Sequence, residues 1–155
     1  MDRIDKKILE ILQTNSQINN QDLAEKVALS PSSCLRRVKQ LEEDGYISKY
    51  VALLNPEKIG LALTIIVMVS LNSHEPQKMQ NFEKSITSFP EVVQCYLIAG
   101  QTADYMVKVV VPNLNDYQSF LLNKLTLIDG VSTVHSSFVL RSLVEKTALP
   151  LNYCL

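Results

Sequence analysis

The stretch from Ser30 to Gln40 carries hydroxyl, guanidinium, ammonium and amide groups at helical spacing. Successive residues of a helix turn by about 100°, so its apolar side chains should gather on one face. The residues expected on that inward face are Cys34, Leu35, Val38 and Leu41. Arg36 points almost opposite them. Arginine pairs with guanine and glutamine with adenine, so Arg36 and Gln40 are candidates for reading bases.

The other polar groups of this stretch are candidates for holding phosphates. The residues predicted to contact DNA are Ser30, Ser32, Ser33, Arg36, Arg37, Lys39 and Gln40. Acidic residues appear only after Gln40, so a helix entering the major groove by its N-terminus would keep them away from the phosphates. An ordinary amphipathic helix with a solvated polar face is the alternative for the helix taken alone.

The local sequence also predicts how this helix is held. Ser30 suits the N-cap, Pro31 suits the first helical position and Gly45 suits the left-handed residue after the C-cap. A second capped helix begins at Asn19 and stops near 28–29, leaving the short connection typical of a helix-turn-helix. The remaining elements expected in this part are a first helix over 2–14, a strand or wing over 46–53 and a turn at 55–56.

The rest of the chain alternates between strand and helix patterns. The order strand, helix, strand, strand, helix, strand predicts a ferredoxin-like βαββαβ fold, so the fold class is α+β. The expected ranges are 61–71, 76–88, 92–99, 104–111, 115–126 and 131–141. The first strand is apolar on both faces, which favours dimerisation through the sheet. The predicted domains are 1–60, for DNA binding, and 61–155, for effector binding and oligomerisation.

Composition excludes several classes of protein. Lys and Arg total 15 against 16 Asp and Glu, so any DNA binding must come from a local cluster of cations. The three cysteines lack the spacing of a zinc site or a disulfide framework, so no metal and no cofactor are expected. Residues 61–71 are too short a run to span a membrane. The sequence therefore predicts a cytoplasmic protein.

These motifs resemble the Lrp/AsnC family of leucine- and asparagine-responsive regulators, also called feast/famine proteins. The N-terminal stretches that carry the resemblance are 2–9, 23–24, 29–38 and 41–42, and the C-terminal ones are 100–105, 136–141 and 147–151. The resemblance implies a winged helix-turn-helix joined to a ferredoxin-like RAM domain that senses amino acids. It also implies dimers, which in the family often assemble into octamers.

The resemblance further places an amino-acid effector beside the loop after Gly100, between neighbouring dimers. Backbone N–H groups there could hold the α-carboxylate and Asp104 the α-ammonium. The effector residues predicted on the loop are Gly100, Gln101, Thr102, Ala103, Asp104 and Tyr105, and those on the opposite wall are Ser132, Thr133, His135, Ser136 and Ser137. A plain hairpin turn and a polar face or interface are the alternatives. Leu97 and Ile98 near the loop favour leucine or methionine.

Three other functions remain open at this stage. A nucleoid-organising protein would bind DNA without a ligand response, and a metabolic sensor would use the helical domain to bind protein. Some haem-pathway decarboxylases resemble this family, but His74 and His135 are the only histidines and no catalytic motif accompanies them. We therefore expect a regulator that is not an enzyme and whose effector shifts the equilibrium between dimers and larger assemblies.

Overall fold

The computed structural model describes residues 1–100 and 102–153. The chain forms two compact units. One contains residues 1–53 together with the C-terminal segment from Leu143 onward, and the other contains residues 54–142. The sequence-based division at residue 60 differs from this arrangement, because it assigns the whole C-terminal segment to the second domain. We call the two parts the helical unit and the sheet unit.

Three helices form the helical unit: α1 (Arg3–Leu12), α2 (Asn20–Val27) and α3 (Pro31–Glu43). The predicted caps are confirmed, since Asn19 and Ser30 accept hydrogen bonds from the first turns of α2 and α3 and Gly45 has φ +76°. Only three residues separate α2 from α3, and Ala28 makes the turn with φ 56°. The buried core residues are Ile8, Leu12, Leu23, Ala24, Val27, Cys34 and Leu41.

Two local expectations for the helical unit are wrong. Residues 46–53 form no strand. A strand must exchange backbone hydrogen bonds with a neighbouring strand, and no strand lies beside these residues among those that the structure describes. Instead Tyr50 anchors the segment by donating a hydrogen bond to Glu42 Oε1, with 2.8 Å between the oxygens. Leu35 is 46% exposed rather than inward, because it lies at the edge of the apolar arc of α3. The turn at 55–56 leads into a short 3-10 helix, Glu57–Ile59.

The sheet unit has the predicted βαββαβ order. Its elements are β1 (Leu63–Leu71), α4 (Pro76–Thr87), β2 (Val92–Leu97), β3 (Tyr105–Val111), α5 (Leu114–Asn123) and β4 (Val131–Phe138). All neighbouring strands are antiparallel, in the order β2-β3-β1-β4. A short 3-10 helix, Leu125–Leu127, extends α5.

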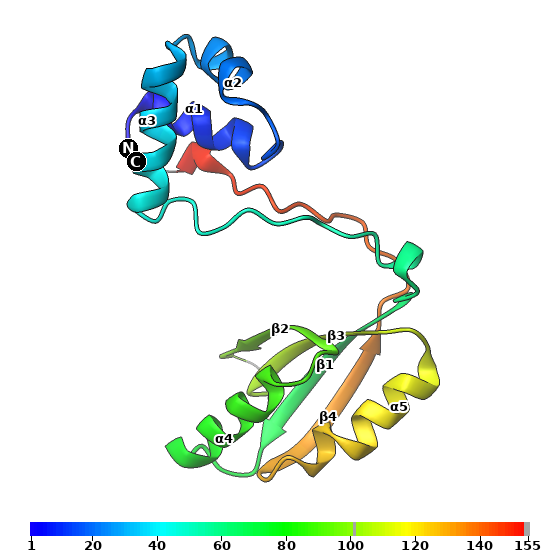
Figure 1. Cartoon of the computed structure of the whole chain (residues 1–155). Helices are drawn as coiled ribbons and strands as arrows, with labels where there is room; N and C mark the ends of the chain where they lie inside the picture. Colours follow the sequence, from blue (N-terminus) through cyan, green and yellow to red (C-terminus); the bar gives the residue numbers. More distant parts are fainter. Residues whose placement is uncertain (101, 154–155) are drawn as a thin grey trace. The chain divides into compact units, whose positions relative to one another are not determined.

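Both helices cover the same face of the sheet (Figure 1). Ile65, Val67 and Val69 on β1 are fully buried beneath them, packed with Phe82 of α4 and Phe120 of α5. Side chains alternate along a strand, so the residues between these three point to the opposite face. No helix of the described residues is long and apolar enough to cross a membrane.

The uncovered face of the sheet is rich in apolar side chains. Met68 on β1 pairs with Met106 on β3 and with His135 on β4, and Ile66 lies two residues before it. These apolar residues are half-buried within the single chain, although no helix of the sheet unit covers them. The face therefore retains apolar surface that a further layer of protein could bury.

Candidate functional site

The start of α3 is fixed by hydrogen bonds from two directions. Ser30 Oγ accepts a hydrogen bond from the backbone N–H of Ser33, at 3.3 Å, and donates one to the Ser33 hydroxyl, at 3.0 Å. Asn20 at the start of α2 donates through Nδ2 to the Pro31 carbonyl, at 2.8 Å. These bonds hold the N-termini of α2 and α3 together, so the first turns of α3 have a defined direction within the helical unit.

Most of the predicted DNA-contacting residues are exposed, and one of the two arginines is the main exception. Ser32, Arg36, Lys39 and Gln40 are exposed, and Ser33 is partly buried beside the cap. Gln40 donates a hydrogen bond to Asp44 Oδ1, at 2.8 Å, so its amide is held toward the C-terminal end of α3. Arg36 lies near the middle of the exposed arc of α3. The arc can therefore present a guanidinium, an ammonium and hydroxyl groups to a DNA duplex.

Arg37 is the exception, because it is bound to α1. Its Nη1 lies 2.6 Å from Asp2 Oδ2 and 2.7 Å from Asp5 Oδ1, and its side chain is 30% exposed. Asp2 and Asp5 also form the capping box that starts α1. Backbone hydrogen bonds from the first turn, with the nearby guanidinium, lower the pKa of Asp2 to about 2. Arg37 thus braces α3 against α1 rather than standing free for a phosphate.

The predicted effector loop is tied to the end of β1. The Asp104 N–H donates to the Val69 carbonyl, at 2.9 Å, and the Ser70 hydroxyl donates to the Thr102 carbonyl, at 3.2 Å. Gly100 is exposed with φ +85°, a conformation that favours glycine. The loop is therefore a defined turn with an accessible backbone at Gly100. Gln101 lies outside the described residues.

Asp104 has both carboxylate oxygens engaged. Oδ2 accepts the backbone N–H of Leu71, at 2.7 Å, and Oδ1 lies 2.7 Å from His74 Nε2. The Leu71 hydrogen bond and the imidazole together hold the pKa of Asp104 below its ordinary value, against the opposing effect of burial. The Asp104 side chain is 19% exposed and the His74 side chain 69% exposed. A ligand could therefore reach Asp104 by displacing its exposed partner, His74.

Two of the predicted loop residues point away from the loop surface. Tyr105 is 1% exposed, packs its ring 4.5 Å from that of Phe82 and donates a hydrogen bond to Glu83 Oε1 at 2.9 Å. Burial, more than the nearby Glu83, raises the pKa of the Tyr105 phenol. Ala103 is 7% exposed. Both side chains are therefore turned into the sheet unit and away from the surface of the loop.

The predicted opposite wall on β4 is divided between the two faces of the sheet. Thr133, His135 and Ser137 pair with residues of the uncovered face of β1. Ser136 pairs with Val67 on the helix-covered face, and its hydroxyl lies 2.5 Å from that of Tyr117. Ser132 donates to the Ser70 carbonyl, at 3.0 Å, and so joins β4 to the end of β1. Successive strand residues cannot form one wall, which is why Ser136 separates from its neighbours.

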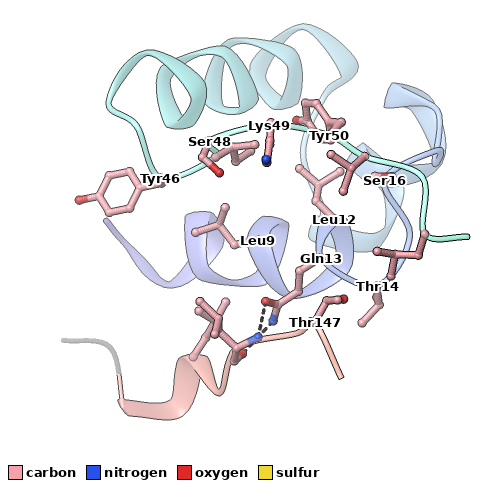
Figure 2. A pocket seen from close by; sticks show the side chains of 15 residues that line it. Leu9, Leu12, Gln13, Thr14, Ser16, Tyr46, Ser48, Lys49, Tyr50 and Thr147 are labelled. Carbon is pink, nitrogen blue, oxygen red and sulfur yellow. Dashed lines mark hydrogen bonds between the residues drawn. The ribbon is translucent and has the colours of Figure 1, made fainter. Parts of the chain in front are cut away.

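The C-terminal segment contributes a contact that the sequence did not reveal. Gln13 at the end of α1 donates to the Leu149 carbonyl, at 3.0 Å, and accepts the Leu149 N–H, at 2.9 Å. The segment helps to line a pocket of about 540 Å³ (Figure 2). Leu9 and Leu12 of α1 face residues 46–51 across it. A side-chain amide paired with both backbone groups of one residue fixes the segment on α1 much as a neighbouring strand would.

Two residues of the Arg37 cluster, Asp2 and Asp5, could be anticipated in part from the local sequence. Asp2 and Asp5 have capping-box spacing, which the sequence shows directly. Nothing local announces that Arg37, more than 30 residues later, completes the cluster, or that His74 meets Asp104. Among the described residues, no group of three or more His, Cys, Asp or Glu side chains is arranged to hold a metal ion.

Comparisons with known proteins agree with this architecture. Residues 1–48 match the family described as winged helix-turn-helix DNA-binding, and residues 64–149 match the Lrp/AsnC ligand binding domain. The Bkd operon transcriptional regulator of Pseudomonas aeruginosa is 43% identical over 97% of this chain and 98% of its own. The leucine-responsive regulatory protein of Escherichia coli is 34% identical over 96% and 90%, respectively.

Solved structures show the same likeness over the whole chain. A transcriptional regulator of Neisseria meningitidis in complex with L-methionine has a TM-score of 0.95 and 40% identity, covering 100% of this chain and 99% of its own. An AsnC family transcriptional regulator of Agrobacterium tumefaciens has the same TM-score and identity, with both chains fully covered. Fold and helix-turn-helix define a DNA-binding transcription regulator. The chain belongs to the Lrp/AsnC family, and its relatives are named as regulators rather than enzymes.

Proposed function

We propose that this regulator reads specific DNA sequences through the exposed arc of α3, with Arg36 as its central base contact. The observation that carries the proposal is the different environment of the two adjacent arginines. Arg36 is exposed, whereas Arg37 is bound by Asp2 and Asp5. Arg36 and Lys39, with the hydroxyl of Ser32, then form the cationic part of the arc that can enter the major groove.

The second part of the proposal is a response to a free amino acid at the loop that follows Gly100. The solved relative from Neisseria meningitidis contains L-methionine, which supports methionine or leucine as the effector. The exposed backbone at Gly100 suits the α-carboxylate. The α-ammonium can reach Asp104 by taking the position of the His74 imidazole, since His74 is the exposed partner of that pair.

Assembly links the two sites. The uncovered sheet face supplies apolar surface for a dimer, as an isologous contact between two copies would require. Two helical units related by a two-fold axis would then bind half-sites separated by whole helical turns. An effector that prefers one assembly, whether the dimer or an octamer, shifts the population toward it and changes DNA binding by linkage.

Selection of bound genomic fragments, with and without methionine or leucine, tests the two parts together. We expect an enriched pseudo-palindromic sequence and a set of fragments that changes with the amino acid. Uniform recovery of fragments would favour a nucleoid-organising role, and an unchanged set would contradict the effector.

Arg36→Ala tests the base contact directly. At fixed salt, the variant should bind the selected sequence more weakly by about 1–3 kcal/mol, because a bidentate contact with guanine is lost. Unchanged affinity in a gel-shift titration would count against α3 as the reading helix. Lys58→Ala, in the 3-10 helix outside the helical unit, provides a matched loss of one positive charge.

A further inference from the structure

Leu35 is a large apolar side chain in the exposed surface of α3. The structure describes every residue of α3, and its other large apolar side chains, Val38 and Leu41, contribute to the core. Leu35 remains 46% exposed. Burial of a leucine side chain normally stabilises a fold, and this stabilisation is only partly realised for Leu35. Almost half of the side chain is therefore available for contact with another molecule.

The position of Leu35 within α3 places it among the groups proposed to face DNA. Since α3 begins at Pro31, Leu35 is its fifth residue, within the N-terminal turns that approach base edges in a helix-turn-helix. Ser32 and Lys39 lie one turn before and after it on the same side of the helix, and Arg36 follows it directly. All three neighbours are exposed.

The binding of Arg37 by α1 fixes which side of α3 is turned outward. Asp2 and Asp5 hold the Arg37 guanidinium on the side of the helix away from Leu35. The outward arc is thereby centred between Leu35 and Gln40, with Arg36 near its middle. Leu35 forms the apolar flank of this arc, and Gln40, held toward Asp44, forms the other flank.

We infer that Leu35 contacts the 5-methyl group of a thymine in the major groove, next to the base read by Arg36. The inference rests on the proposed DNA-reading role of α3. Thymine is the base that presents a methyl group in the major groove, and apolar side chains recognise it by direct contact. Leu35 thereby becomes a specificity-determining residue, which selects thymine at one position in each half-site.

Thymine-to-uracil replacement tests this contact, because deoxyuridine lacks only the 5-methyl group and keeps the same base pairing. Each thymine of the selected duplex is replaced in turn and the Kd is measured for the wild type and for Leu35→Ala. Loss of one buried methyl group corresponds to about a fourfold rise in Kd. We expect the wild type to show this rise at one position per half-site and Leu35→Ala to show none there.

Matched variants define the alternatives. Leu122→Ala, which removes an exposed leucine from α5, should keep the wild-type preference for thymine, and Leu35→Met should keep much of it. Equal thymine preference in the wild type and Leu35→Ala overturns the inference and leaves the proposed DNA reading by α3 intact. A folded Leu35→Ala protein that binds no duplex also overturns the inference. Failure of the wild type to select any duplex overturns the proposed function itself.

Discussion

Two adjacent arginines show how a single contact can reassign a residue. The sequence predicts DNA contacts for both Arg36 and Arg37, because both lie on the polar side of α3. The structure binds Arg37 to two carboxylates at the start of α1 and leaves Arg36 exposed. The difference depends on residues more than 30 positions away, so no local pattern in α3 could have separated the two side chains.

The carboxylate of Asp2 should make the stability of the helical unit decrease at low pH. Its pKa is about 2 in the folded chain against an ordinary 3.8, so its charge stabilises the fold above about pH 4. That contribution is lost as the pH falls toward 2. Asp2→Asn keeps a good N-cap residue but removes the charge, so its Tm should fall below that of the wild type at neutral pH and converge with it near pH 2.

A double-mutant cycle separates this ion pair from other effects of the substitution. In an Arg37→Gln background, Asp2→Asn should change the Tm at pH 7 by less than it does in the wild type. An equal change in both backgrounds would mean that Asp2 acts through the α1 cap alone.

Asp104 should stabilise the sheet unit even without a ligand. Its side chain accepts the N–H of Leu71, a residue that is only 7% exposed. Asp104→Ala should lower the free energy of unfolding by about 1–3 kcal/mol, because the N–H loses its partner in a mostly buried position. Urea denaturation measures the loss, and faster hydrogen exchange at the Leu71 amide would locate it.

The exposed partner of Asp104 provides the control. His74→Ala leaves the bond between Asp104 and Leu71 in place, so it should reduce stability much less than Asp104→Ala. Equal losses would assign the stabilisation to the imidazole contact instead.

At the scale of elements, the sequence predicted best where the determinants are local. The N-caps Asn19 and Ser30 and the left-handed Gly45 are confirmed, because each depends on one residue and its nearest backbone groups. The βαββαβ order is also confirmed, because its periodicity lies within each element. The strand over 46–53 was wrong, since strand formation depends on a partner that the local sequence does not specify.

The candidate site was harder to predict than the fold. The sequence predicts an effector site from residues of β3 and β4, but Tyr105 and Ser136 point to the covered face of the sheet. A shift of one position along a strand changes the face of a side chain. The sequence therefore located the loop but not the orientation of every side chain around it.

The N-cap of α3 should contribute measurably to stability. Ser30→Ala removes the hydroxyl that accepts the Ser33 N–H, and loss of such a cap costs about 1 kcal/mol. Chemical denaturation should show this loss, whereas Ser16→Ala, at an exposed serine between α1 and α2, should show much less. Equal stability of the wild type and Ser30→Ala would contradict a role for this cap in holding α3.

At the scale of the whole molecule, the sheet has one face without a covering layer. The apolar first strand predicted this surface, and the structure identifies its residues as the partners of Met68 on the neighbouring strands. A four-stranded sheet with helices on one face alone leaves half of its side chains outside the core of the chain. The proposed dimer would bury them.

Met68→Asp tests this surface. A carboxylate taken out of water at this apolar interface costs about 3 kcal/mol or more, so the dimer should weaken by at least about 100-fold. Light scattering after size exclusion should then show a monomer at concentrations where the wild type is dimeric. Gln77→Asp, on the exposed side of α4, should leave the mass unchanged, and an unchanged mass for Met68→Asp would place the interface elsewhere.

The bond between Gln13 and Leu149 has a practical consequence for work on this regulator. Because Leu149 of the C-terminal segment is bound to α1, and Asp2 is the N-cap of α1, the described residues near both ends of the chain belong to the helical unit. A fluorophore or affinity tag attached near Asp2 or after the C-terminal segment would therefore report on the helical unit rather than on the sheet unit. A label intended to follow the sheet alone belongs inside the chain, on an exposed position of α4 or α5.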